Sequence, residues 1–271
     1  MSNSLTLDWY EISNPSTGVF ALREPLQVER VLSYLIVGNE RALLIDSGTG
    51  AVSMKAAVET LTDLPVLLIN SHSHWDHAGN NDEFADIAIH RAEAHELARD
   101  YSRADIEEFF GEAALLGPLP DGRTIDSISI DASRPTMVLD GGEIFDLGGR
   151  SIAVLHTPGH APGLLSFLDE QHGILFSTDT AYPGYLYAYG DDTDMTTYIR
   201  SMEYLAELAP TLTVVHPSHN ADSMSPDLLP EMRDALLAVA NGRQPDSLDE
   251  SRAIYDFDGF GVYGRLPGER R

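Results

Sequence analysis

The segment Ser71–His77 concentrates more potential chemistry than any other part of this 271-residue chain. Four side chains that can bind a metal ion, His72, His74, Asp76 and His77, lie within it in the pattern His-x-His-x-Asp-His. By chance this pattern is expected in about one in a thousand chains of this composition. Because the chain has no Cys, imidazole and carboxylate ligands indicate Zn²⁺, with Fe²⁺ and Mn²⁺ as alternatives.

The spacing within this motif suggests two metal ions. Alternate residues of an extended loop share one side, so His72 and His74 can converge on one ion. Asp76 and His77 are neighbours, and a turn is needed before both can face a second ion.

More polar residues follow three other predicted strands. His160 follows a strand over 152–156, and Asp179 follows a strand over 173–177. His216 is the last residue of a strand over 212–216, and His219 follows that strand. Proteins of the α/β type build sites at the carboxyl ends of strands. These residues are therefore candidates to complete the metal site.

Taken in order, the motifs resemble the metallo-β-lactamase-fold superfamily over nearly the whole chain, from Asp46 to beyond His219. The resemblance implies an α/β (α+β) fold, a four-layer αββα sandwich, with a dinuclear metal site. Carried over residue by residue, it assigns His72, His74 and His160 to the first ion, Asp76, His77 and His219 to the second, and Asp179 to a bridging position. His216 is the alternative to His219, which is preferred because it ends a Pro-Ser-His turn like the family's final histidine. Asp46 either orients the metal loop or forms a turn.

The same resemblance implies a dinuclear-metal-dependent hydrolase. Two dications about 3.5–4 Å apart produce a bridging hydroxide near neutral pH, which would attack the carbonyl of an ester, lactone or thioester. Asp76 is assigned to catalysis as well as to metal binding. Asp179 stands where antibiotic-degrading members typically have Cys or Ser, which argues against β-lactamase activity. A mononuclear iron dioxygenase of the same fold and a non-catalytic metal-binding effector remain alternatives.

Tyr182 is the second predicted catalytic residue. It lies three residues after Asp179, as in the quorum-signal lactonases, where a Tyr helps polarise the lactone carbonyl; the alternative is that it only packs. Glyoxalase-type thioesterases tend to have Phe there and a basic C-terminal segment for glutathione, which this acidic chain lacks. The Tyr-rich stretch 182–189 is expected to be a loop lining the site, with Trp75 adding to the same wall. Amphipathic rings favour a small-molecule substrate with an apolar portion.

Alternating apolar and polar patterns predict the elements that position these residues. Strands are expected at 32–37, 42–46, 66–70, 87–90, 136–139, 143–146, 152–156, 164–168, 173–177, 212–216 and 253–262, and helices at 53–61, 93–110, 195–208 and 226–239. The segment 71–80 is expected to be a loop. We expect one domain over residues 1–271, with a helical or loop insertion at about 91–135. This insertion is expected either to form a lid, with Phe109 and Phe110 among its apolar contacts, or to place these side chains in packing against the scaffold.

Composition limits the partners. With 17 basic and 43 acidic residues, the formal charge is −26, which disfavours nucleic-acid binding. No apolar run approaches the ~20 residues that span a bilayer, and the start of the chain lacks a signal-peptide pattern, so a cytoplasmic protein is expected. The oligomeric state is open, a homodimer included. The dispersed acidity suggests a salt-loving host, which thermal melts in increasing KCl would test.

Overall fold

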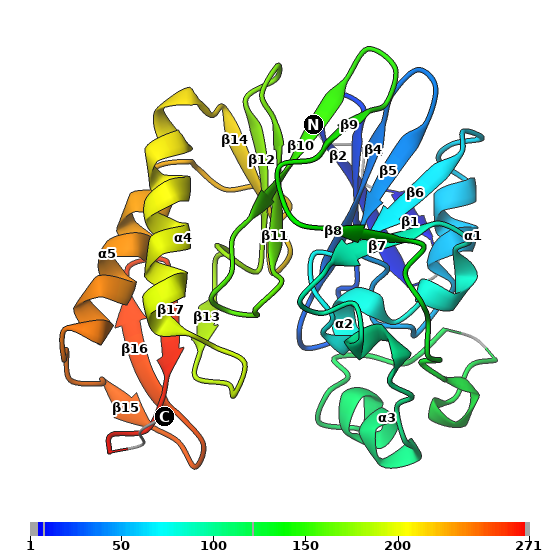
Figure 1. Cartoon of the computed structure of the whole chain (residues 1–271). Helices are drawn as coiled ribbons and strands as arrows, with labels where there is room; N and C mark the ends of the chain where they lie inside the picture. The colour runs from blue at the N-terminus through cyan, green and yellow to red at the C-terminus, as the bar shows by residue number, and fades with distance from the viewer. Residues whose placement is uncertain (1–4, 8, 121, 269–271) are drawn as a thin grey trace. The chain divides into compact units, whose positions relative to one another are not determined.

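The computed structural model describes residues 5–7, 9–120 and 122–268. The chain divides into two compact units, Met1–Ile152 and Ala153–Arg271, each with its own hydrophobic core (Figure 1). The prediction of one domain over 1–271 with an insertion at about 91–135 stays a prediction.

The first unit is built on a sheet of eight strands in sequential order. They are β1 (Leu5–Leu7), β2 (Tyr10–Ser16), β3 (Val19–Arg23), β4 (Leu32–Val37), β5 (Ala42–Ile45), β6 (Val66–Ile69), β7 (Ile87–His90) and β8 (Met137–Leu139). The pairs from β1 to β5 are antiparallel, whereas β5 to β8 run parallel. Because parallel strands end at one edge, the segments that follow β5 and β6 meet there.

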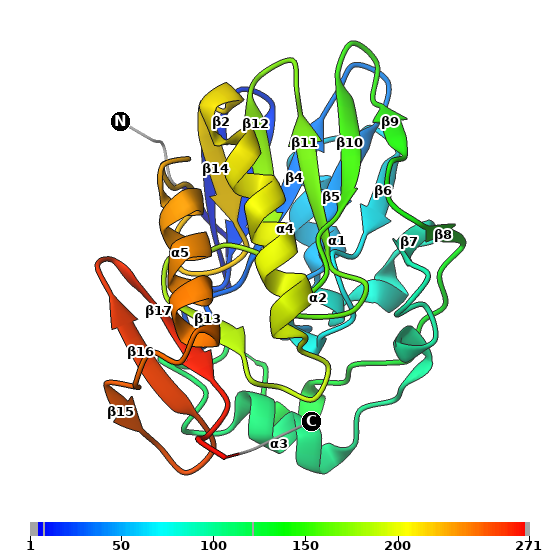
Figure 2. The same ribbon diagram turned by 60° about the vertical axis from the view of Figure 1, so that its left-hand side comes forward.

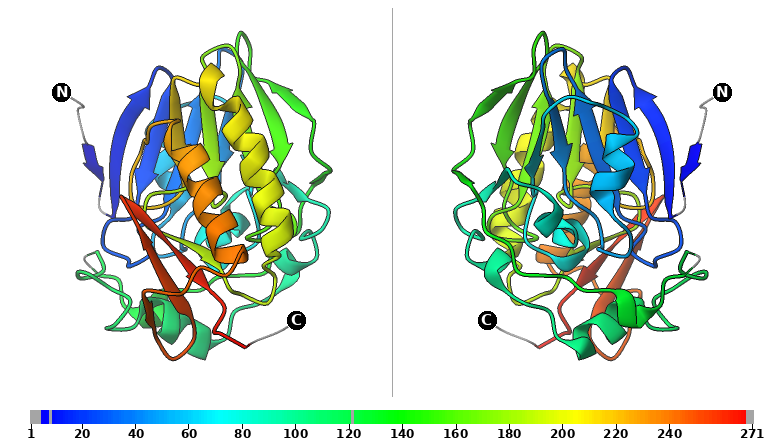
Figure 3. Two further views of the ribbon diagram at one scale, coloured as in Figure 1. Left: turned by 90° about the vertical axis from the view of Figure 1, so that its left-hand side faces the viewer. Right: turned by 90° about the vertical axis from the view of Figure 1, so that its right-hand side faces the viewer.

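Short helices connect these strands. They are α1 (Met54–Glu59), α2 (Trp75–Ala78), η1 (Asn81–Glu83), η2 (Glu96–Ala98), α3 (Arg103–Phe110) and η3 (Ile125–Ser127). Ser53 caps α1, which covers one face of the sheet (Figure 3, right). The predicted loop over 71–80 contains α2. The single helix predicted over 93–110 is wrong: the segment breaks into η2 and α3, and a capping box of Ser102 and Asp105 starts α3 afresh.

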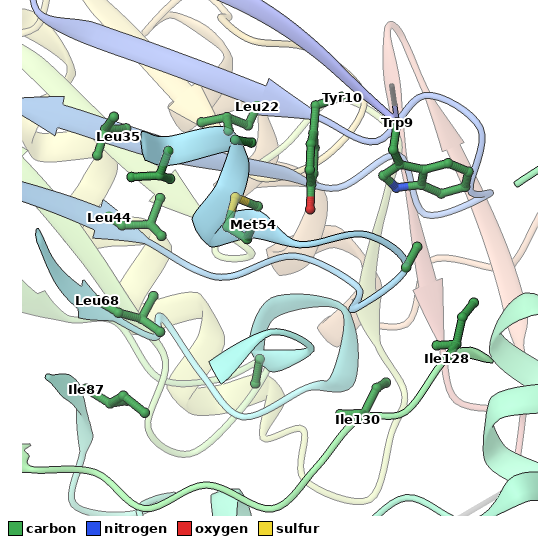
Figure 4. Close-up of a cluster of buried hydrophobic side chains, with 14 of the residues drawn as sticks. Trp9, Tyr10, Leu22, Leu35, Leu44, Met54, Leu68, Ile87, Ile128 and Ile130 are labelled. Carbon is green, nitrogen blue, oxygen red and sulfur yellow. The ribbon is translucent and has the colours of Figure 1, made fainter. Parts of the chain in front are cut away.

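The core of this unit lies between the sheet and α1. Leu35, Leu44 and Leu68 project from successive strands toward Met54 of α1, and Tyr10 closes the group (Figure 4). Strands buried on both faces read as continuous apolar runs, which is why the predictions over 32–37 and 87–90 match the structure to the residue.

The second unit holds a sheet in the order β14-β12-β11-β10. Its members are β10 (Ser151–His156), β11 (Leu165–Asp169), β12 (Ile174–Thr178) and β14 (Val214–Pro217); β9 (Ile144–Asp146) precedes β10 in the chain. The helices α4 (Met195–Leu208) and α5 (Leu228–Ala240) lie side by side over one face of this sheet (Figure 2; Figure 3, left). The predicted helix over 195–208 is confirmed, with Asp194 as its cap.

A smaller sheet completes this unit, in the order β13-β17-β16-β15. It contains β13 (Tyr185–Ala188), β15 (Ser247–Leu248), β16 (Ala253–Phe257) and β17 (Phe260–Gly264). The single strand predicted over 253–262 is wrong, because Asp258-Gly259 turns the chain into a hairpin and Gly259 has φ +80°. The Tyr-rich stretch expected to be a loop contains β13, which pairs in parallel with β17.

The mixed α/β class predicted from the sequence is confirmed. Among the described residues, no helix is long and apolar enough to cross a membrane.

Candidate metal centre

The first unit brings the four residues of the His-x-His-x-Asp-His motif together at the end of β6. Nε2 of His72 lies 2.8 Å from Nδ1 of His74. The chain then turns into α2, and Oδ2 of Asp76 lies 3.5 Å from Nε2 of His77. His72, Asp76 and His77 are buried. The turn that the motif requires between its two pairs is therefore supplied by the start of a helix.

The second unit brings together the other three predicted ligands. Oδ2 of Asp179 lies 3.6 Å from Nε2 of His160 and 3.2 Å from Nε2 of His219. All three side chains are buried. His216 points elsewhere: its Nδ1 is 2.6 Å from the carbonyl of Asp222. The geometry within this unit thus favours His219 over His216.

The donor atoms suit a divalent metal ion. Nitrogen ligands of a tetrahedral Zn²⁺, at bond lengths of about 2.0–2.1 Å, lie about 3.3 Å from one another. The separations within each unit run from 2.8 to 3.6 Å. The set contains only imidazole nitrogens and carboxylate oxygens, which fits Zn²⁺, Fe²⁺ or Mn²⁺ equally well.

Asp46 fixes the protons of two of these imidazoles. Its Oδ2 lies 2.9 Å from Nδ1 of His77 and accepts a hydrogen bond from the Ser71 hydroxyl at 2.8 Å. With its proton given to Asp46, the Ser71 oxygen can only accept from Nδ1 of His72, 3.0 Å away. Both Nε2 atoms are then left with a lone pair for a metal. Burial raises the pKa of Asp46, and the facing His77 opposes that rise.

The backbone conformation around Asp46 places its carboxylate next to His77 and Ser71. Asp46 itself has φ +63°, a left-handed conformation that Asp tolerates better than most residues. Behind it, the amide of Ser47 donates to the carbonyl of His77 at 2.8 Å. At Gly79 a Cβ would lie 2.2 Å from the carbonyl carbon of Thr49, so only glycine allows the two loops to meet.

Two buried glutamates accept hydrogen bonds either from the motif itself or from the loop that packs against Gly79. Glu93 accepts a hydrogen bond from the backbone amide of Ser73, between the first two histidines, at 2.6 Å. Glu24 accepts from the indole of Trp9 and from the amide and hydroxyl of Thr49, in the loop that follows β5. Burial raises the pKa of Glu24 to about 6, while the bonds from Thr49 and Trp9 lower it. Sequence reasoning missed both residues, since neither belongs to a recognisable pattern.

His160 is oriented by the small sheet of its own unit. Its Nδ1 lies 3.2 Å from the carbonyl of Tyr187 in β13. A carbonyl can only accept, so Nδ1 carries the proton and Nε2, which faces Asp179, carries the lone pair. This contact gives the Tyr-rich strand a direct connection to a predicted ligand.

Tyr182 lies in the same network. Its hydroxyl donates to the carbonyl of Tyr185 at 2.7 Å and accepts from the amide of Tyr187 at 3.2 Å. Its ring centroid is 5.0 Å from that of His219. The hydroxyl is thus engaged by the backbone of β13. The catalytic role of Tyr182 stays a prediction, and these contacts favour the packing alternative.

The remaining histidines have partners outside the predicted ligand set. These contacts are His90 with the amide of Ala92, His95 with Glu96, His156 with the carbonyl of Pro162, and His172 with Asp169.

Aromatic rings gather on the motif from the segment 91–135. The indole of Trp75 stacks on the ring of Phe109 with centroids 4.0 Å apart and planes 2° from parallel. Phe110 meets Trp75 edge-on at 5.7 Å, and Tyr101 meets Phe109 at 5.6 Å. These four residues form an aromatic stack in which Phe110 is buried and the other three rings are partly exposed, and Trp75 stands between His74 and Asp76 in the chain.

Comparison with known proteins identifies the family. The model of the metallo-beta-lactamase superfamily matches residues 26–219. The chain belongs to that superfamily. The match begins after β3 and ends on His219, so it covers all seven predicted ligands of this superfamily member.

Two of the relatives are hydrolases by name. The chain is 30% identical over 216 residues to an acyl-coenzyme A thioesterase, MBLAC2, of Bos taurus, covering 74% of this chain and 77% of that one. It is 28% identical over 149 residues to the hydroxyacylglutathione hydrolase GloC of Haemophilus influenzae, covering 54% and 64%. A solved metallo-beta-lactamase from Pontibacter korlensis aligns with TM-score 0.62 at 18% identity, over 84% of this chain and 99% of that one. The predicted fold class is therefore confirmed, and the chain is a member of a metallo-hydrolase superfamily.

Proposed function

We propose that the protein is a dinuclear-metal-dependent hydrolase that cleaves an acyl thioester or ester. The observation that carries the proposal is the second-unit triad, in which one oxygen of Asp179 faces Nε2 of both His160 and His219 at 3.6 and 3.2 Å. A carboxylate between two imidazoles is the arrangement expected of a ligand shared by two ions. Membership of the superfamily supports joining this triad to the four residues of the first unit.

The seven residues would hold two divalent ions, Zn²⁺ in the first instance. These are His72, His74, Asp76, His77, His160, Asp179 and His219. When bound, such ions lower the pKa of water and polarise a carbonyl or phosphoryl oxygen. They would therefore provide a nucleophile without the need for a Ser or Cys side chain.

The chain's own residues prepare the ligands. Asp46, acting directly on His77 and through Ser71 on His72, keeps the imidazole protons on Nδ1. The Tyr187 carbonyl does the same for His160. Fixing each tautomer before binding removes a rearrangement that would otherwise weaken metal affinity. Asp76 and Asp179 contribute two negative charges, which leaves a pair of divalent ions with net positive charge to stabilise a developing oxyanion.

The acyl part of the substrate would lie against apolar rings. Trp75 stands between two of the proposed ligands in the chain, and the partly exposed rings of Trp75 and Phe109 would offer apolar area to an aliphatic or aromatic acyl group. The thioesterase and hydroxyacylglutathione hydrolase relatives favour a thioester as the bond. A lactone is less favoured, because the Tyr182 hydroxyl already bonds to β13.

The test combines metal analysis with a substrate panel. Purified protein is expected to carry two divalent ions per chain and to hydrolyse acyl-coenzyme A thioesters or p-nitrophenyl esters faster than lactones and phosphodiesters. Replacing His72 by Ala should remove metal and activity, whereas His95→Ala, at an exposed histidine outside the set, should change neither. One iron per chain with oxygen consumption would identify a dioxygenase instead. Full metal loading without turnover of any substrate would indicate a binding protein.

A further inference from the structure

Helix α4 contacts two of the three turns that carry proposed ligands in the second unit, those of Asp179 and His160. Its Tyr198 side chain is fully buried, and the hydroxyl lies 3.0 Å from the carbonyl oxygens of Asp179 and Thr180. One phenolic proton is thus directed at two backbone acceptors in the turn that presents the bridging carboxylate.

The other loop rests on the same residue. A Cβ at Gly159 would lie 2.2 Å from the Cα of Tyr198, so the turn before His160 packs directly on the helix backbone. The amide of Asp194, the helix cap, donates to the carbonyl of Gly159 at 2.8 Å, and the hydroxyl of Ser201 donates to the carbonyl of Pro158 at 2.6 Å. Helix α4 therefore holds the His160 turn at its backbone and the Asp179 turn through one phenol.

The turn before Asp179 has a strained backbone that needs support from surrounding contacts. Thr178, immediately before the ligand, has φ +49°, a left-handed conformation that a β-branched residue adopts at a cost in energy. Strained backbone persists only when surrounding contacts determine it, and the Tyr198 hydroxyl supplies such a contact on the next two carbonyls.

We propose that Tyr198 is a positioning residue for metal binding: it fixes the Asp179 turn against the His160 turn, and so sets how well the two ligands are prearranged for an ion. The inference rests on the proposed metal-dependent function. It assigns the phenol a role through Asp179 and His160, with no contact to substrate.

The experiment titrates metal-free protein with Zn²⁺ in competition with a chromophoric chelator. Tyr198→Phe keeps the ring and removes only the hydroxyl, and it is expected to weaken Zn²⁺ binding about 10-fold or more, since two buried carbonyls lose their donor. Tyr204→Phe is the matched control, on the same helix but 42% exposed, and should bind like the parent protein.

Thermal unfolding of the metal-free proteins separates positioning from plain stability. A purely structural hydroxyl would lower the melting temperature of Tyr198→Phe but leave the Zn²⁺ affinity of the folded protein unchanged, and that result would overturn the inference. If Tyr198→Phe does not fold, Ser201→Ala decides the question: weaker Zn²⁺ binding supports positioning by α4, and unchanged binding refutes it. Failure of the parent protein to bind Zn²⁺ would instead refute the proposed function.

Discussion

The two units prepare their proposed ligands in different ways. In the first unit the four ligands are contiguous, and side-chain carboxylates hold them: Asp46 orients His77 directly, and Glu93 bonds to the backbone between His72 and His74. In the second unit the three ligands come from separate turns, and phenols and backbone carbonyls hold them, through Tyr182, Tyr198 and the carbonyl of Tyr187.

The two halves of the proposed site differ in the charge of the groups that support the ligands. In the first unit the supports are charged: Asp46 bonds to the His77 ring, and Glu93 bonds to the backbone between two ligands, so a substitution there removes a negative charge. In the second unit the supports are neutral: the Tyr198 hydroxyl bonds to backbone carbonyls, and the Tyr187 carbonyl bonds to the His160 ring, so a substitution there leaves the charge unchanged. The first half should therefore be sensitive to loss of charge and the second to loss of a hydroxyl.

The largest expected effect comes from removing a ligand in either half. Asp76→Ala and Asp179→Ala should each reduce hydrolysis by more than about 10²-fold, since each removes a ligand and a compensating charge. Steady-state rates on the best substrate of the panel provide the measurement, with Asp63→Ala, an exposed acid, as control. Retention of most activity by Asp76→Ala would contradict the hydroxide mechanism.

Next comes the charged support of the first half. Asn at position 46 tolerates the left-handed backbone, but as a neutral amide it accepts a weaker hydrogen bond from Nδ1 of His77, so Asp46→Asn should lower metal affinity about 10–100-fold. Asp169→Asn is the matched control, because Asp169 is also a buried acid bonded to a histidine, His172, outside the proposed site. Equal effects of the two variants in the Zn²⁺ titration would argue against a specific role for Asp46.

The raised pKa of Glu24 predicts that the stability of the protein depends on pH. Its folded pKa of about 6 lies above the ordinary value of 4.5, so the folded protein binds the proton more tightly than the unfolded chain. Its contribution to stability is present below pH 4.5 and is lost as the pH rises through about 6, by about 2 kcal/mol. Urea unfolding of the parent protein and Glu24→Gln from pH 4.5 to 7.5 measures this: the free-energy difference should change by that amount, and a constant difference would disprove the assignment.

The smallest effect is expected at Tyr182. Tyr182→Phe loses two hydrogen bonds to β13, and we expect metal affinity and all hydrolysis rates to fall together, by about threefold to tenfold. Ratios of kcat for a lactone and an ester distinguish the roles. A selective loss of about 10-fold or more on lactones alone would restore the catalytic role predicted from the sequence.

The sequence predicted the first half of the proposed site better than its supports. The contiguous motif stands out by composition, and buried strands such as 32–37 read as apolar runs. Asp258-Gly259 is typical of a turn, but the apolar residues on either side led to the prediction of one continuous strand over 253–262. Glu24 and Tyr198 were not predicted because their hydrogen-bond partners lie 15 to 25 residues away in the sequence, and such contacts leave no spacing pattern.

The parallel pairing of β13 with β17 has a consequence for how this chain can be shortened. The family match stops at residue 219, which invites a minimal version without the remaining 52 residues (271 − 219). Yet β17 pairs with β13, and the carbonyl of Tyr187 in β13 accepts the hydrogen bond from Nδ1 of His160. Trimming the chain there would remove the strand that pairs with β13 and so loosen a ligand 59 residues upstream of the cut. The strand β17 lies outside the family match, but its hydrogen bonds make it part of the scaffold that orients His160.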